Sequence, residues 1–86
     1  MIKFIYAPSF LKQLKKIEPS LKEEILEKID LFENEKNHEY LKVHKLHGKF
    51  SGCFSFSVNY KIRIVFQYMS KDEVAILSVG DHDSYR

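Results

Sequence analysis

The spacing of apolar residues differs between the two halves of this 86-residue chain, and that difference constrains its fold more than any other feature. From Phe10 to about residue 33, apolar side chains recur every three or four positions, as on amphipathic helices. From Gly52 onward they alternate with polar side chains, as on strands that bury one face. Helices followed by a group of strands predict an α+β fold rather than repeated βαβ units.

A short strand and a first helix are predicted at the start of the chain. Ile2–Tyr6 has the apolar alternation of a strand. Ser9 follows Pro8 and is expected to be the N-cap of the helix, because a serine hydroxyl there satisfies a free backbone N–H group. One apolar stripe of this helix should be buried, made by Phe10, Leu11, Leu14 and Ile17.

Pro19 separates this helix from a second one, and so short a break predicts a helical hairpin. Ser20 and Glu23 have the spacing of a capping box, in which the two residues satisfy each other's free backbone donors. The second helix should bury Leu21, Ile25, Ile29 and Phe32. Residues 34–41 are polar and are expected to form a loop.

Three strands are predicted in the second half, and Asn59-Tyr60 should turn the chain between the first two. Val74–Val79 is apolar at both odd- and even-numbered positions, so both faces of this strand should be buried, which favours a central position in the sheet. The whole chain, residues 1–86, is therefore expected to be one α+β domain of order β-α-α-β-β-β. Its helical hairpin should pack on one face of a small antiparallel sheet.

Alternation assigns the strand residues to the two faces of that sheet. Those expected to face the helices are Phe54, Phe56, Ile62, Ile64 and Phe66. Those expected on the open face are Ser55, Ser57, Lys61, Arg63 and Gln67. A polar open face is common in ordinary antiparallel sheets, so it indicates where a site could lie and does not establish one.

The positive charges are gathered in the middle of the chain. Residues 40–71 contain six Lys and Arg residues and no acid, against seven cations and eight acids in residues 1–39 and one cation and four acids in residues 72–86. A surface of one sign favours a nucleic-acid partner, because neutralised phosphates provide much of the affinity. The alternative is that solvated strands simply carry Lys in place of Glu.

Several classes of protein are disfavoured. Cys53 is the single cysteine, so no intramolecular disulfide can form and a reducing cytoplasm fits. No apolar run approaches the roughly 20 residues of a membrane span, and the first residues do not read as a signal peptide. His44 and His47 lie three apart but have no strong third ligand, so neither a metal nor another cofactor is expected.

The segment 45–66 reads KLHGKFSGCFSFSVNYKIRIVF and resembles the central block of the RelE/ParE superfamily of toxins. The ending 79–86, VGDHDSYR, is similar to the closing motifs of that superfamily, which contain Gly, His and Tyr. With the order of elements, the resemblance covers essentially the whole chain. It implies a toxin with a small antitoxin protein as its partner.

The resemblance implies two activities between which the sequence alone does not decide. RelE-like members are endoribonucleases that cleave mRNA, often on the ribosome, and this mRNA interferase activity is our prediction. ParE-like members inhibit DNA gyrase and lack a nuclease centre. Under this alternative the chain is a binding protein without catalytic activity. A third interpretation is a degenerate toxin that only binds its antitoxin.

Metal-free cleavage of RNA needs three groups. A base takes the proton of the 2′-OH, a cation stabilises the phosphorane, and an acid protonates the leaving 5′ oxygen. His82 is the first candidate for acid or base, because imidazole titrates near neutrality and the resemblance places a histidine there. Arg63 is the candidate cation, since a guanidinium grips two phosphate oxygens. The alternative for His82 is an ordinary solvated histidine near the terminus. The alternative for Arg63 is an ion pair across the strands.

Further candidates surround these two. Tyr85 could stack on a base or bond the phosphate, and its alternative is a lid on the core. His47 lies in a basic loop flanked by glycines and could be a further base or phosphate ligand, its alternative being a solvated loop. His44 and His38 are interpreted as surface residues. The residues predicted to bind RNA are Lys45, Lys49 and Lys61.

Overall fold

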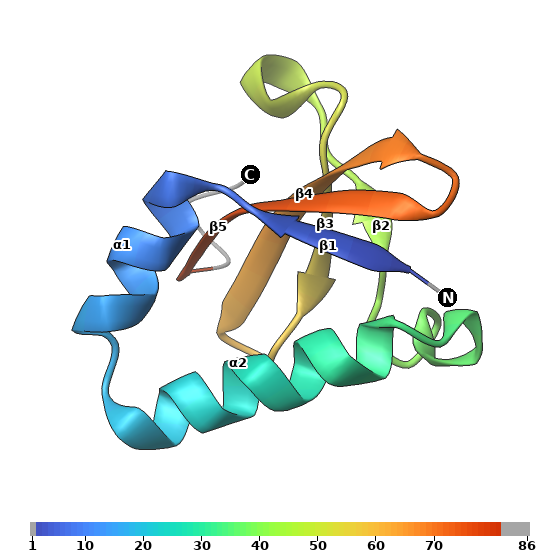
Figure 1. Cartoon of the computed structure of the whole chain (residues 1–86). Helices are drawn as coiled ribbons and strands as arrows, with labels where there is room; N and C mark the ends of the chain where they lie inside the picture. The colour runs from blue at the N-terminus through green and yellow to red at the C-terminus, as the bar shows by residue number, and fades with distance from the viewer. Residues whose placement is uncertain (1, 82–86) are drawn as a thin grey trace.

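The computed structural model describes residues 2–81 of the chain. Two helices lie on one side of a twisted sheet (Figure 1). The helices are α1 (Pro8–Lys16) and α2 (Pro19–Phe32), with 3₁₀ turns at Glu35–Asn37 and Gly48–Phe50. The strands are β1 (Lys3–Tyr6), β2 (His44–Lys45), β3 (Phe54–Ser57), β4 (Ile62–Ser70) and β5 (Glu73–Asp81).

The sheet has the strand order β1-β5-β4-β3-β2. The predicted α+β class is confirmed, and β5 lies between two neighbours, as its apolar character indicates. The sheet is mixed, however, because β1 runs parallel to β5 while the other pairs are antiparallel. Alternation shows which residues of a strand are buried but not which strand pairs with it, so the fully antiparallel sheet predicted from the sequence was wrong.

Both helices begin two residues earlier than predicted. Ala7 is the N-cap of α1 and Glu18 that of α2, and each is followed by a proline at the first helical position. Proline is favoured there because its missing N–H has no helical acceptor to lose. The predicted caps are therefore wrong: Ser9 donates to the carbonyl of Leu77, and Ser20 donates to Glu18 Oε1 at 2.6 Å instead of forming a box with Glu23.

The core lies between the helices and the sheet. Phe32 of α2 is fully buried, and its ring lies 4.8 Å from the ring centroids of both Phe56 and Phe66. The stripes predicted for the two helices are confirmed except at Leu11, which is 45% exposed. The strand residues expected to face the helices all pack in or against this core: Phe54, Phe56, Ile62, Ile64 and Phe66.

α1 covers the edge of β5 beyond the end of β1. The side chain of Gln13 exchanges two hydrogen bonds with the backbone of Val79, both 2.9 Å long. The hydroxyl of Ser9 donates to the carbonyl of Leu77 on the same edge. These side chains satisfy the backbone groups that a longer β1 would have paired. They hold the last residues of β5, which lie beside Arg63 of β4.

Candidate functional site

The sheet face that points away from the helices is here called the back face. Register places its residues in rows that cross the strands. One row contains Ser57, Arg63 and Gly80, and the next contains His44, Ser55, Val65 and Ser78. Two of these residues are buried, Ser55 at 0% exposure and Val65 at 2%, so this face is less open than predicted.

Arg63 stands in the middle of β4 with a serine on one side and a glycine on the other. Gly80 has no side chain, so β5 contributes none beside Arg63 in this row. Arg63 is half-buried, and its Nη1 nitrogen has almost no contact with solvent. A guanidinium held in this way presents its planar fork in a defined direction, as recognition of a phosphate requires.

His44 is the site residue that the sequence analysis missed. Its Nδ1 lies 3.0 Å from the carbonyl oxygen of Lys42, and its Nε2 lies 3.5 Å from Ser55 Oγ. Because a carbonyl can only accept, Nδ1 must carry a proton, and in the neutral ring Nε2 keeps its lone pair. Lys42 has a φ of 58°, a left-handed conformation that turns its carbonyl toward the ring.

His44 and Arg63 lie on the same face, two strands apart and two residues apart along the strand direction. Strand spacing puts their Cα atoms about 12 Å apart. The only sequence signal for His44 was its position in a basic stretch, and its neighbours become visible only once β2 is paired with β3.

A basic loop, residues 46–53, connects β2 to β3 at the end of the sheet beyond His44. His47 and Lys49 are both exposed there, and Lys49 Nζ lies 5.5 Å above the ring of Phe50. Gly48 and Gly52 have φ angles of 67° and 91°, which glycine adopts at no steric cost. Arg63, His44 and the loop therefore follow one another along the sheet.

Two of the lysines predicted to bind RNA lie apart from this arrangement. Lys45 is opposite Phe54, so its position in the register belongs to the helix side of the sheet. Lys61 lies in the exposed turn between β3 and β4, at the end of the sheet nearest Arg63. His82 and Tyr85 lie outside the described residues.

The pKa shifts in the described residues belong to two tyrosines at the helix side. Burial raises the pKa of Tyr6, and the charge of Glu33 raises it further. Burial also raises the pKa of Tyr68, with a smaller contribution from Glu35.

Residues 2–81 contain no group of three His, Cys, Asp or Glu side chains that could hold a metal ion. None of the described helices is long and apolar enough to cross a membrane.

Comparison with known proteins bears on the fold. No family model matches the sequence, and no curated protein matches it significantly. Solved structures do match, over nearly the whole chain. A conserved hypothetical protein from Helicobacter pylori is 23% identical, with 96% of this chain and 97% of that chain covered and a TM-score of 0.72.

Two further matches are complexes of two proteins by name, and the first is named a toxin–antitoxin complex. The YoeB–YefM toxin–antitoxin complex from Staphylococcus aureus contains a chain 19% identical, with 95% and 98% coverage and a TM-score of 0.72. The archaeal RelE–RelB complex from Pyrococcus horikoshii contains a chain 21% identical, with 93% of both chains covered and a TM-score of 0.71. This chain has the RelE fold.

The RelE fold confirms, at the level of structure, the resemblance seen in the sequence. The segment 45–66 that carried the resemblance runs from the end of β2 through the basic loop and β3 into β4. In the RelE fold of this chain it forms much of the back face. The stretch that carried the sequence resemblance is thus the stretch that contains both the basic loop and Arg63.

Proposed function

We propose that this chain is the toxin of a toxin–antitoxin pair and that it cleaves mRNA without a metal ion. The observation that carries the proposal is the placement of Arg63 and His44 on one face of a RelE fold. The YoeB–YefM and RelE–RelB structures are complexes, which supports an antitoxin protein as the partner. An mRNA substrate implies a cytoplasmic protein.

In this mechanism His44 Nε2 takes the proton from the ribose 2′-OH as its oxygen attacks the adjacent phosphorus. The Arg63 guanidinium binds the non-bridging oxygens and stabilises the phosphorane. His82 protonates the 5′ oxygen as its bond to phosphorus breaks, and Tyr85 positions the base or the phosphate. The products are a 2′,3′-cyclic phosphate and a 5′-OH end.

The basic groups provide the binding surface for the RNA backbone. His47 and Lys49 extend the back face at the loop, and Lys61 extends it at the opposite end. Lys45, on the edge strand β2, would contact RNA that passes around that edge. Since DNA lacks the 2′-OH, the same surface would hold a DNA strand without cutting it.

The test is cleavage of end-labelled RNA by the purified protein in EDTA, with and without ribosomes. We expect 2′,3′-cyclic phosphate ends, and no product when the cleaved nucleotide carries a 2′-deoxyribose. His44→Ala and His82→Ala should each lower turnover about 10²- to 10⁴-fold, while the exposed control Lys36→Ala leaves it unchanged. Growth arrest with intact mRNA and gyrase-linked DNA damage would establish the ParE-like alternative instead.

The antitoxin should cover or displace part of the back face. A specific complex should bury more than about 1,000 Å² in total, and the acids of the antitoxin should lie over the basic residues 42–63. A co-crystal structure measures this directly. An antitoxin that touches neither this surface nor the two helices contradicts the expectation.

A further inference from the structure

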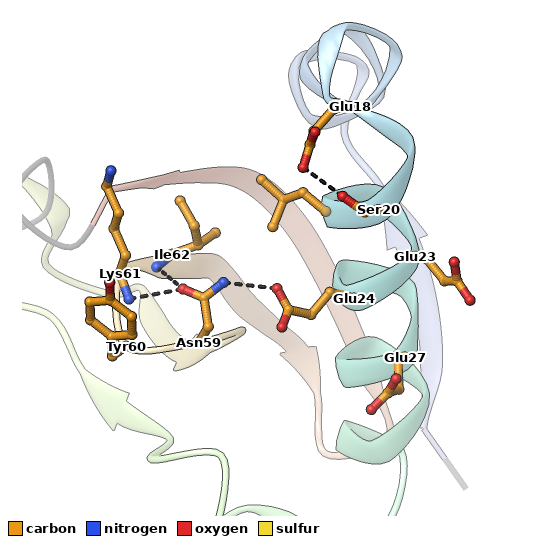
Figure 2. Close-up of a pocket in the computed structure, with 10 residues that line it drawn as sticks. Glu18, Ser20, Glu23, Glu24, Glu27, Asn59, Tyr60, Lys61 and Ile62 are labelled. Carbon is orange, nitrogen blue, oxygen red and sulfur yellow. Dashed lines mark hydrogen bonds between the residues drawn. The ribbon is translucent and has the colours of Figure 1, made fainter.

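A hollow between α2 and the β3–β4 turn lies beside the site described above and shares with it only Lys61 of the residues proposed to bind RNA (Figure 2). Its volume is about 740 Å³, enough for several side chains rather than for a single ion. One wall is α2 from Ser20 to Glu27, with Glu18 before it, and the other wall is the turn at residues 59–62.

Asn59 joins the two walls. Its Nδ2 donates to Glu24 Oε1 at 2.8 Å, and its Oδ1 accepts from the backbone N–H groups of Lys61 and Ile62 at 2.9 and 2.8 Å (Figure 2). One side chain thus fixes the turn and attaches it to the helix. The hollow is therefore formed before any partner arrives, and filling it requires little reorganisation of the chain.

The lining combines acidic, apolar and aromatic side chains. Four glutamates of α2 and its cap contribute to it, while Lys61 is the single cation in the lining. A helix face that carries only carboxylates is usually an ordinary solvated surface. Here they lie beside Leu21 and Ile62, which are partly buried against the core, and beside Tyr60, whose side chain is 96% exposed. An aromatic ring so exposed beside an apolar floor is typical of interaction sites.

We propose that this hollow docks a basic amphipathic segment of a protein partner. Lysine or arginine side chains of that segment pair with the carboxylates and lie against the ring of Tyr60, as cations do on aromatic faces. An apolar side chain of the segment lies on Leu21 and Ile62. The glutamates repel both nucleic acid and acidic peptides, so charge complementarity selects a basic polypeptide.

This proposal goes beyond the ribonuclease function and does not depend on it. The hollow is acidic, whereas the back face and its loop are basic, so the two surfaces select ligands of opposite charge. A protein bound at the hollow leaves His44 and Arg63 accessible to RNA. A variant of Arg63 that no longer cleaves RNA should therefore still bind at the hollow.

The experiment titrates a synthetic amphipathic peptide, with leucines on one helical face and lysines and arginines on the other, into the ¹⁵N-labelled chain. Chemical shift changes should concentrate at residues 18–27 and 59–62. Glu24→Gln should weaken binding about two- to fivefold, because the amide still accepts from Asn59 while the charge is lost. Tyr60→Ala should weaken it about fivefold, and its ring is too exposed for folding to depend on it.

The matched controls are Glu39→Gln and Tyr40→Ala, which change an exposed acid and a tyrosine 70% exposed outside the hollow. Both should bind the peptide as the parent chain does. Equal losses in controls and hollow variants overturn the proposal, and so does equal binding of a peptide with glutamates in place of its basic residues. Shifts at the hollow that depend on protein concentration without peptide assign it to a second copy. Shifts at residues 18–27 on addition of RNA without peptide assign it to nucleic acid. Either result also overturns the proposal.

Discussion

The two faces of the sheet differ in what they bury. On the helix side, Phe32 lies against Phe4, Phe56 and Phe66, and aromatic and aliphatic side chains fill most of the space. On the back face, the buried groups include the hydroxyl of Ser55 and a nitrogen of Arg63. Apolar burial stabilises the fold strongly, whereas a buried polar group adds little net stability even when it is hydrogen-bonded. The helix side therefore supports stability, and the back face is where function is expected.

The largest effect on stability should come from the helix side. Phe32→Ala removes a ring that is fully buried at the centre of the aromatic cluster. The free energy of unfolding should fall by about 3–5 kcal/mol, from lost burial and the cavity left behind. Urea titration measures the loss. A loss below about 1 kcal/mol would mean that the helix side is not the main source of stability.

On the back face the largest effect should fall on activity. Arg63→Ala should lower RNA cleavage about 10²- to 10³-fold, as the loss of a group that stabilises transition-state charge does. Arg63→Lys should restore only part of the rate, because an ammonium lacks the two-pronged geometry of the guanidinium. Single-turnover rates and antitoxin binding should be measured together. Full activity in Arg63→Ala would remove this residue from the mechanism.

Two histidines provide a matched test of the comparison. His38, expected at the surface, lies instead against Phe32 with ring centroids 4.3 Å apart, and its Nε2 is 2.8 Å from the carbonyl of Phe32. His38→Ala should therefore lower the free energy of unfolding by about 1–3 kcal/mol and leave cleavage unchanged. His44→Ala should show the reverse pattern. Similar effects of both changes would contradict the division of roles between the faces.

A smaller effect should appear in the salt dependence of RNA binding. Each phosphate contact contributes about one unit to the slope of log affinity against log salt concentration. Lys49→Ala, in the basic loop, should reduce the slope by about that amount and leave sequence preference unchanged. Lys12→Ala, on the exposed surface of α1, serves as the control. Identical slopes in the two variants would mean that the loop does not contact RNA.

The smallest effect concerns alkaline pH and the helix side. The pKa values of Tyr6 and Tyr68 are raised by burial, so the folded state keeps their protons to a higher pH than the unfolded state does. This contribution to stability is complete below pH 10 and is lost as the pH rises above it. Tyr6→Phe/Tyr68→Phe should lose less stability than the parent chain between about pH 9 and 11. Thermal unfolding at several pH values measures the loss for both proteins. Equal losses of stability in the variant and the parent chain would contradict this prediction.

Much of the candidate site could be anticipated from local sequence. Arg63 was placed on the face away from the helices because Ile62 and Ile64 flank it, and the register confirms that position. His44 could not be recognised, because its interaction with Ser55 depends on pairing between strands eleven residues apart. Ser55 was expected at an open surface, since alternation indicates the side of a sheet and not what covers it.

The sequence by itself determined the elements and their buried sides, because apolar spacing is a local property that selects helix or strand at each segment. Tertiary structure alone decided that β1 joins β5 in parallel and that Gln13 covers the edge that β1 leaves. It also decided that Asn59 attaches the β3–β4 turn to Glu24. These contacts join residues 35 to about 70 positions apart. They form only when the elements pack, and no local pattern reports them in advance.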